Sequence, residues 1–134
     1  MTQATHSMVG LRELPDDNAD GSFGAGYSAS FARRALGCEA IGLSLQRLDA
    51  GARQAFAHRH EADEEVYVVL AGSGVATVDD EAITLQPWTA LRVAPTAVRS
   101  FAAGPEGLEF LAFGAHTDDD GEVVALQPGS TDEP

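Results

Sequence analysis

Residues 51–72 decide the fold, and they read Gly51-Ala-Arg-Gln-Ala-Phe-Ala-His58-Arg-His60-Glu-Ala-Asp-Glu-Glu65-Val-Tyr-Val-Val-Leu-Ala-Gly72. His58 and His60 are two residues apart, so on an extended strand both imidazoles leave the same face, about 7 Å apart. An acidic, turn-like stretch follows, and residues 65–70 predict a strand that folds back antiparallel beside residues 52–60. This hairpin would bring the Glu65 carboxylate to the two imidazoles. Two neutral nitrogens and one carboxylate form a partial ligand set for Zn, Fe, Mn or Ni.

The spacing of this stretch resembles the first motif of the cupins: Gly, several residues, His-x-His, three or four residues, Glu, six residues, Gly. His58, His60, Glu65 and Gly72 match that pattern, and Gly51 lies one residue early. Glu64 is the competing carboxylate under the shorter spacing. The six-residue count to Gly72 favours Glu65.

A second cupin motif, Leu-x-Pro-Gly-Asp followed by a strand and Pro-x-Gly-x-x-His, lies along residues 85–101 with several departures. Trp88 stands where Gly is usual, Ala94 and Thr96 where Pro and Gly are usual, and Arg99 where the family places its last metal-binding His. The resemblance spans roughly residues 40–115. It implies an all-β double-stranded β-helix, or jelly-roll barrel, with the site in its open mouth.

Arg99 determines which chemistry this site could support. A guanidinium is always protonated and has no lone pair for a metal. About 5 Å from a divalent ion it would repel that ion by roughly 7 kcal/mol at an effective dielectric of 20. A good structural zinc site contributes on the order of 10–16 kcal/mol, so Arg99 would weaken metal binding without abolishing it.

Three arrangements follow from this comparison. In the first, His58, His60 and Glu65 hold a metal, and Arg99 clamps an anionic substrate bidentately. In the second, Arg99 pairs with Glu65, no metal binds, and Arg99, the imidazoles and Tyr67 hold a small ligand. In the third, the pocket is vestigial and these residues only satisfy one another.

Three aromatic residues join Arg99 as candidate substrate contacts because of their strand parity. Tyr67 shares the face of Glu65, Phe56 that of the two histidines, and Phe101 that of Arg99. Phe56 is expected to form a hydrophobic wall of the pocket. For Tyr67 the alternative is a core aromatic residue with a satisfied hydroxyl.

The remaining chain predicts one domain of many short strands, in keeping with its 134 residues. Residues 1–27 are expected to form an N-terminal arm, residues 28–127 the barrel and residues 128–134 a disordered tail. Residues 29–36 predict a strand, with a helix over residues 28–36 as the alternative. Turns are expected at residues 71–74, 104–107 and 118–121.

Charge and composition exclude several classes of partner. Eight Arg and no Lys against 21 acidic residues give a formal charge of −13, which argues against nucleic acid and anionic membrane as partners. No apolar run approaches the roughly 18 residues of a membrane span, and residues 1–10 do not resemble a secretory signal. Cytoplasm is the expected location. The single Cys38 excludes an intrachain disulfide.

The sequence therefore predicts a small cupin that binds a divalent metal and an anionic or oxygen-rich small molecule, with a metal-dependent dioxygenase or isomerase as candidate activities. The alternative is a metal-free binding or sensing module without catalysis. Whether the protein is an enzyme stays open at this point. A homodimer is also expected, in which the N-terminal arm could add a strand to a neighbour's sheet edge.

Overall fold

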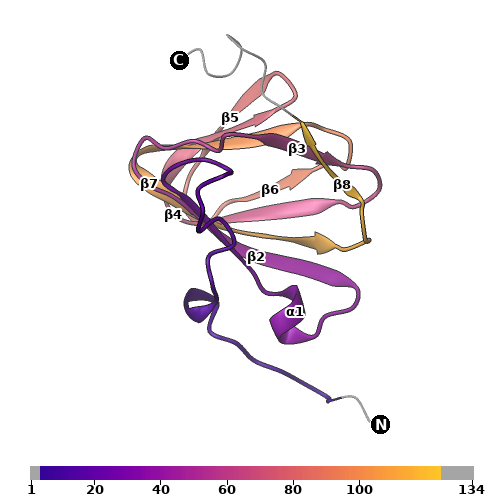
Figure 1. Cartoon of the computed structure of the whole chain (residues 1–134). Helices are drawn as coiled ribbons and strands as arrows, with labels where there is room; N and C mark the ends of the chain where they lie inside the picture. Colours follow the sequence, from indigo (N-terminus) through magenta and orange to yellow (C-terminus); the bar gives the residue numbers. More distant parts are fainter. Residues whose placement is uncertain (1–3, 125–134) are drawn as a thin grey trace.

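The computed structural model describes residues 4–124, and within them the chain is almost entirely β-strand (Figure 1). The predicted tail at residues 128–134 and the last predicted barrel residues lie outside this range. A 3-10 turn, η1 (Leu11–Glu13), and a short helix, α1 (Arg33–Leu36), are the helical elements of the described part. The strands are β1 (Tyr27–Phe31), β2 (Ile41–Leu48), β3 (Ala57–His60), β4 (Glu65–Val78), β5 (Glu81–Leu85), β6 (Ala90–Val93), β7 (Arg99–Ala115) and β8 (Gly121–Val124).

Two long antiparallel strands, β4 and β7, organise the sheet. They pair from Glu65 opposite Gly114 to Val78 opposite Arg99, with an interruption at residues 104–107 of β7, which have no partner in β4. β2 and β3 pair with β7, while β5 and β6 pair with β4. β1 lies outside β2, and β8 lies outside β3. The sheet curls on itself into a barrel, which confirms the all-β prediction (Figure 1).

The turns expected at residues 71–74 and 104–107 are wrong, because both stretches lie inside β4 and β7. The register shifts there, between Val69 and Ala71 and again between Gly72 and Gly74. Gly72 has φ of 84°, and a Cβ added to it would lie 2.0 Å from the Gly107 carbonyl oxygen. The glycines therefore permit an irregularity that bends two continuous strands.

The predicted hairpin between residues 52–60 and 65–70 is also wrong. β3 begins only at Ala57 and pairs with β7 and β8, whereas β4 pairs with β5, β6 and β7. The two segments meet through the barrel interior and not as hydrogen-bonded neighbours. Strand parity gives the face of a side chain but not the pairing partner, which long-range contacts decide.

The strand predicted over residues 29–36 is correct only as far as Phe31, where β1 ends. Arg33–Leu36 forms the short helix α1, which Gly37 ends in the left-handed conformation at φ 75°. The strand prediction is therefore correct for the start of this segment, and the helical alternative is correct for its end.

The N-terminal loop, residues 16–26, packs across the barrel of its own chain. Its backbone accepts hydrogen bonds at Phe23 from Ala55 (3.0 Å) and at Gly26 from Asp49 (2.8 Å). Asp17 also donates its backbone N–H to the Ala29 carbonyl at 2.7 Å. Among residues 4–124 no helix has the length and apolar character needed to span a membrane.

Candidate functional site

Five side chains from three strands form a polar cluster: His58 and His60 on β3, Glu65 and Tyr67 on β4, and Arg99 on β7. Four of them approach one atom, Oε1 of Glu65. His58 Nε2 lies 3.4 Å from it, His60 Nε2 3.2 Å, the Tyr67 hydroxyl 2.6 Å and Arg99 Nη2 3.3 Å. The structure therefore brings together the two imidazoles, the carboxylate and the guanidinium that the sequence predicted to meet.

Strand register accounts for this convergence. His58 lies directly opposite Arg99 in the pairing of β3 with β7. Glu65 and Tyr67 are two residues apart at the start of β4, so they face the same side of the sheet. Glu64 instead is exposed and contacts Arg92, so Glu65 is the carboxylate that faces the imidazoles.

Arg99 is fully buried at 0% exposure, and each of its three guanidinium nitrogens has a partner. Nε donates to the Tyr67 hydroxyl at 3.1 Å, and Nη2 donates to Glu65. Nη1 donates to the carbonyls of Pro95 (3.0 Å) and Ala97 (2.7 Å). The Arg99–Glu65 pair of the second arrangement is thus present. The role of Arg99 as a substrate clamp stays a prediction, for which this conformation offers no exposed nitrogen.

The protonation states of the cluster follow from burial and from these contacts. Burial alone would raise the pKa of Glu65, but the contacts with His58, His60 and Tyr67 outweigh it and hold that pKa well below its usual range. Burial and the neighbouring carboxylate raise the pKa of Tyr67 well above 10. The Glu65 carboxylate raises the pKa of His60 above its usual 6.5. The carboxylate is therefore ionised, and the phenol keeps its proton.

The donor set fits a divalent metal ion. One ligand atom from each of His58, His60 and Glu65 lies within 4.8 Å of the others. Nδ1 of His58 and both ring nitrogens of His60 are buried without a hydrogen-bond partner. His60 Nε2 is close to the Glu65 oxygen, yet the ring is not aligned for a hydrogen bond. Buried polar atoms normally find partners, so these nitrogens are suited to a ligand that the protein does not itself supply.

Asp120 is a functional candidate that the sequence analysis missed. Its carboxylate accepts hydrogen bonds from the backbone N–H groups of Glu61, Ala62 and Asp63 at 3.2, 3.0 and 2.9 Å. Its Oδ2 also lies 3.4 Å from His60 Nδ1. Carboxylates beside metal-binding histidines orient the ring. The predicted turn at residues 118–121 was the available signal, but sequence alone does not bring it beside His60.

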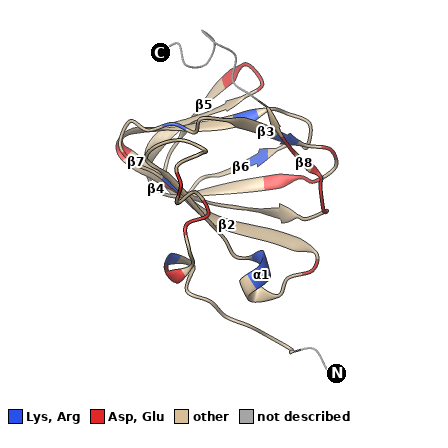
Figure 2. Ribbon diagram, in the orientation of Figure 1, with Lys and Arg blue, Asp and Glu red and all other residues tan. Residues whose placement is uncertain are grey.

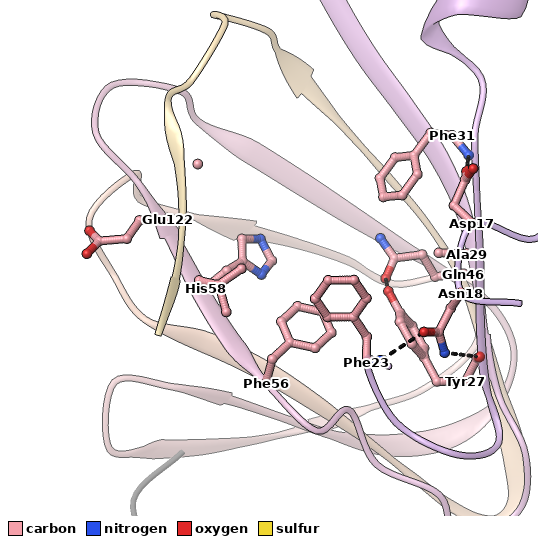
Figure 3. A pocket seen from close by; sticks show the side chains of 12 residues that line it. Asp17, Asn18, Phe23, Tyr27, Ala29, Phe31, Gln46, Phe56, His58 and Glu122 are labelled. Carbon is pink, nitrogen blue, oxygen red and sulfur yellow. Dashed lines mark hydrogen bonds between the residues drawn. The ribbon is translucent and has the colours of Figure 1, made fainter. Parts of the chain in front are cut away.

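An aromatic cavity of about 240 Å³ adjoins His58, walled by Phe23, Tyr27, Phe31 and Phe56 (Figure 3). Phe56 lines it, with its ring centroid 5.1 Å from that of Phe23 and 6.0 Å from that of His58. Phe23 and Tyr27 lie within the stretch predicted as an N-terminal arm, residues 1–27, and they form walls of this cavity.

The other two predicted substrate contacts lie deeper. Tyr67 is 1% exposed and Phe101 is 2% exposed, and their ring centroids are 4.7 Å apart. Phe101 also stacks on Phe110 at 4.6 Å. The surroundings of Tyr67 match the alternative expected from the sequence, a core aromatic residue whose hydroxyl has a hydrogen-bond partner. Direct substrate contact by either ring stays a prediction.

Comparison with known families identifies the class of protein. The model of the cupin domain matches residues 44–114, which is more than half of the chain and includes most of the polar cluster's strands. The chain therefore belongs to the cupin family. The earlier resemblance, drawn from the His-x-His motif and the degenerate second motif, is confirmed.

Solved structures support the same fold. A cupin protein from Bacteroides fragilis is 24% identical, with a TM-score of 0.70, and the match covers 87% of this chain and 89% of that one. The polyketide cyclase RemF from Streptomyces resistomycificus is 17% identical, with a TM-score of 0.73 and coverage of 90% and 87%. A predicted oxalate decarboxylase from Thermotoga maritima is 22% identical, with a TM-score of 0.66 and coverage of 83% and 100%. Comparison with curated protein sequences gave no match.

Proposed function

We propose that this cupin binds a divalent metal ion through His58, His60 and Glu65 and a small organic molecule in the adjoining barrel mouth. The observation that carries the proposal is the approach of two imidazole Nε2 atoms to one carboxylate oxygen, with three of the four ring nitrogens buried and unpartnered. Two imidazoles and one carboxylate leave open coordination positions, as in sites where the metal also contacts substrate.

The bound ion would supply Lewis acidity or a site for dioxygen. The chain itself holds the carboxylate ionised, and the Tyr67 hydroxyl donates to it. Arg99 compensates its charge from the side of β7, and the Asp120 carboxylate lies 3.4 Å from Nδ1 of His60, where it would orient the ring. Metal-dependent dioxygenases and isomerases are the activities proposed, because solved structures with this fold include proteins named as a salicylate 1,2-dioxygenase and as a sugar phosphate isomerase. The fold alone does not choose among reactions.

A metal-free binding module is the second candidate, and Arg99 is the observation that favours it. Its guanidinium is buried 3.3 Å from the carboxylate oxygen that a metal would use. A cation at that place competes with a divalent ion for the same negative charge.

Metal content distinguishes the two candidates. We expect protein purified without chelator to contain a stoichiometric first-row divalent metal, and chelator-treated protein to gain thermal stability on addition of Mn, Fe, Ni or Zn. His60→Ala should abolish this gain. His116→Ala, which removes an imidazole outside the cluster, is the matched control and should preserve it. Absence of metal together with absence of any thermal shift in the wild type would favour the metal-free module.

Arg99→His tests the competition directly. The substitution removes the buried cation and supplies a further imidazole at the position where the family places a metal ligand, so metal affinity should rise at least tenfold, about 1.4 kcal/mol. Isothermal titration with Zn or Ni measures it. An unchanged affinity in a folded variant would mean that residue 99 does not limit metal binding.

We also propose that the protein does not bind nucleic acid, that it forms a homodimer and that it is cytoplasmic. The arginines are spread over η1, α1 and several strands and do not gather on one face of the described residues, which argues against a nucleic-acid surface (Figure 2). A homodimer and a cytoplasmic location are proposed from the sequence. Gel filtration with light scattering tests the first and cell fractionation the second.

A further inference from the structure

We infer that the ligand of this site is an uncharged, planar aromatic molecule of one or two fused rings, bound in the aromatic cavity against His58. The inference deepens the proposed function and rests on it for the presence of a ligand. It replaces the anionic or oxygen-rich ligand expected from the sequence with a different chemical class.

The rings of the wall are the first argument. The centroids of Phe23 and Phe56 are 5.1 Å apart at an interplanar angle of 68°, and those of Tyr27 and Phe56 are 5.9 Å apart. Figure 3 shows these rings grouped on one side of His58. Phe31 is 58% exposed and Phe23 42%, so the wall presents unburied ring surface. Offset and edge-to-face contacts of a further ring with these rings would be favourable beyond the burial of apolar area.

The second argument is that Tyr27 and Asn18, two polar residues of the wall other than His58, already have hydrogen-bond partners within the protein. The Tyr27 hydroxyl donates to Gln46 Oε1 at 2.7 Å. Asn18 uses its amide nitrogen on the carbonyls of Gly24 and Tyr27, and its oxygen accepts from the Phe23 backbone. These groups have few hydrogen bonds left to offer a polar ligand, so the wall favours a ligand with apolar surface.

Charge is the third argument. Among the described residues that line the cavity none is Arg, and the acidic ones are Asp17 and Glu122. Asp17 accepts from the Phe31 backbone, and Glu122 pairs with Arg59 at 3.0 Å. Figure 3 shows the Glu122 carboxylate directed away from the rings. An anion would therefore meet no cation here and would be repelled by a chain of net charge −13.

Volume limits the size of the ligand. A cavity of roughly 150 Å³ lined by apolar side chains holds benzene. The aromatic cavity, at about 240 Å³, therefore takes one ring with substituents or two fused rings. A polar substituent would be directed toward His58, the one wall residue that belongs to the polar cluster.

The test uses the full chain after chelator treatment and three probes of one skeleton: 2-naphthol, 2-naphthoate and decahydro-2-naphthol. We expect 2-naphthol to bind at least tenfold more tightly than the charged or the saturated analogue, as measured by isothermal titration. Tighter binding of 2-naphthoate, equal binding of the saturated probe, or no binding of 2-naphthol would overturn the inference.

Two Phe variants locate the binding. Phe23→Ala should weaken 2-naphthol binding at least tenfold, while Phe113→Ala should change it less than twofold. Phe113 is the matched control because it is 40% exposed, close to the 42% of Phe23, and lies on β7 outside the cavity. Equal effects of the two variants would contradict the assignment.

Metal titration of the same wild-type preparation separates this inference from the proposed function. Metal binding without binding of 2-naphthol would reject the aromatic ligand alone. Binding of 2-naphthol without metal binding would reject the metal site alone.

Discussion

The polar cluster and the aromatic cavity share His58 but are built on opposite principles. In the cluster, four groups approach one carboxylate oxygen, and a fully buried guanidinium depends on that oxygen for its charge compensation. In the cavity, polar groups are satisfied among themselves and the rings are left free. The cluster is therefore strongly coupled, and a single change should affect every member. The exposed rings of the cavity, Phe23 and Phe31, should be removable at a smaller cost to the fold.

The largest expected effect tests this coupling. Glu65→Ala leaves Arg99 buried without its counter-charge, which should lower the free energy of unfolding by about 3–5 kcal/mol. Glu64→Ala is the matched control, because this neighbouring carboxylate is exposed and pairs with Arg92 at the surface. It should cost less than about 1 kcal/mol. Urea denaturation measures both, and similar losses would mean that the cluster is not the coupled unit described here.

Substitution of Asn18 tests whether the cavity wall depends on the hydrogen bonds that hold the N-terminal loop, residues 16–26. It is 4% exposed and joins three backbone groups of the N-terminal loop and β1. Asn18→Ala should destabilise the protein by about 1–3 kcal/mol because buried backbone groups lose their partners. It should also weaken binding of 2-naphthol. Ser22→Ala, at an exposed position of the same loop, should stay within about 0.5 kcal/mol. An unaffected Asn18→Ala variant would show that the loop is held by other contacts.

The pH dependence of stability should come from the cluster and not from the cavity. The lowered pKa of Glu65 stabilises the fold above its ordinary value of 4.5, and this contribution is lost as pH falls. The raised pKa of His60 stabilises the fold below 6.5, and this contribution is lost as pH rises through the raised value.

Metal-free protein should accordingly be most stable between about pH 4.5 and 6.5, with slopes of at most about 1.4 kcal/mol per pH unit for each proton. Thermal denaturation across pH 3–9 checks this expectation. In Glu65→Ala both slopes should flatten. A profile of unchanged shape in that variant would assign the titration to groups outside the cluster.

The smallest effect on stability is expected at Trp88, another position where the chain departs from the cupin motif and against which the departure at Arg99 can be compared. Trp88, where cupins usually have Gly, has φ of 64° and is 79% exposed. A left-handed residue other than Gly costs roughly 1–2 kcal/mol. Since Gly loses about 0.5–1 kcal/mol more entropy on folding, Trp88→Gly should stabilise the protein by only about 0.5 kcal/mol. Trp88→Ala keeps the strained backbone and should give no gain; an equal gain in both variants would remove backbone strain as the cause.

The motif spacing predicted that the side chains of His58, His60 and Glu65 would converge, because short spacing on a strand fixes which face a side chain takes. His58 and His60 share a face by parity, and the six-residue count selected Glu65 over Glu64. The strand-rich class followed from turn signals and alternation. The same signals failed at Gly72 and Gly107, where the glycines mark bends within long strands and not turns between short ones.

Sequence by itself thus determined the strand-rich class through local alternation, the cupin barrel through the resemblance of its motifs, and the three candidate ligands on β3 and β4 through their spacing. Only the tertiary structure decided that β3 pairs with β7, that Arg99 is buried against Glu65, and that Asp120 reaches His60 from about 60 residues away. It also decided that the N-terminal loop supplies Phe23 to the cavity wall. Those features depend on contacts between distant segments, whose partners are chosen by the packing of the whole barrel and not by any local pattern.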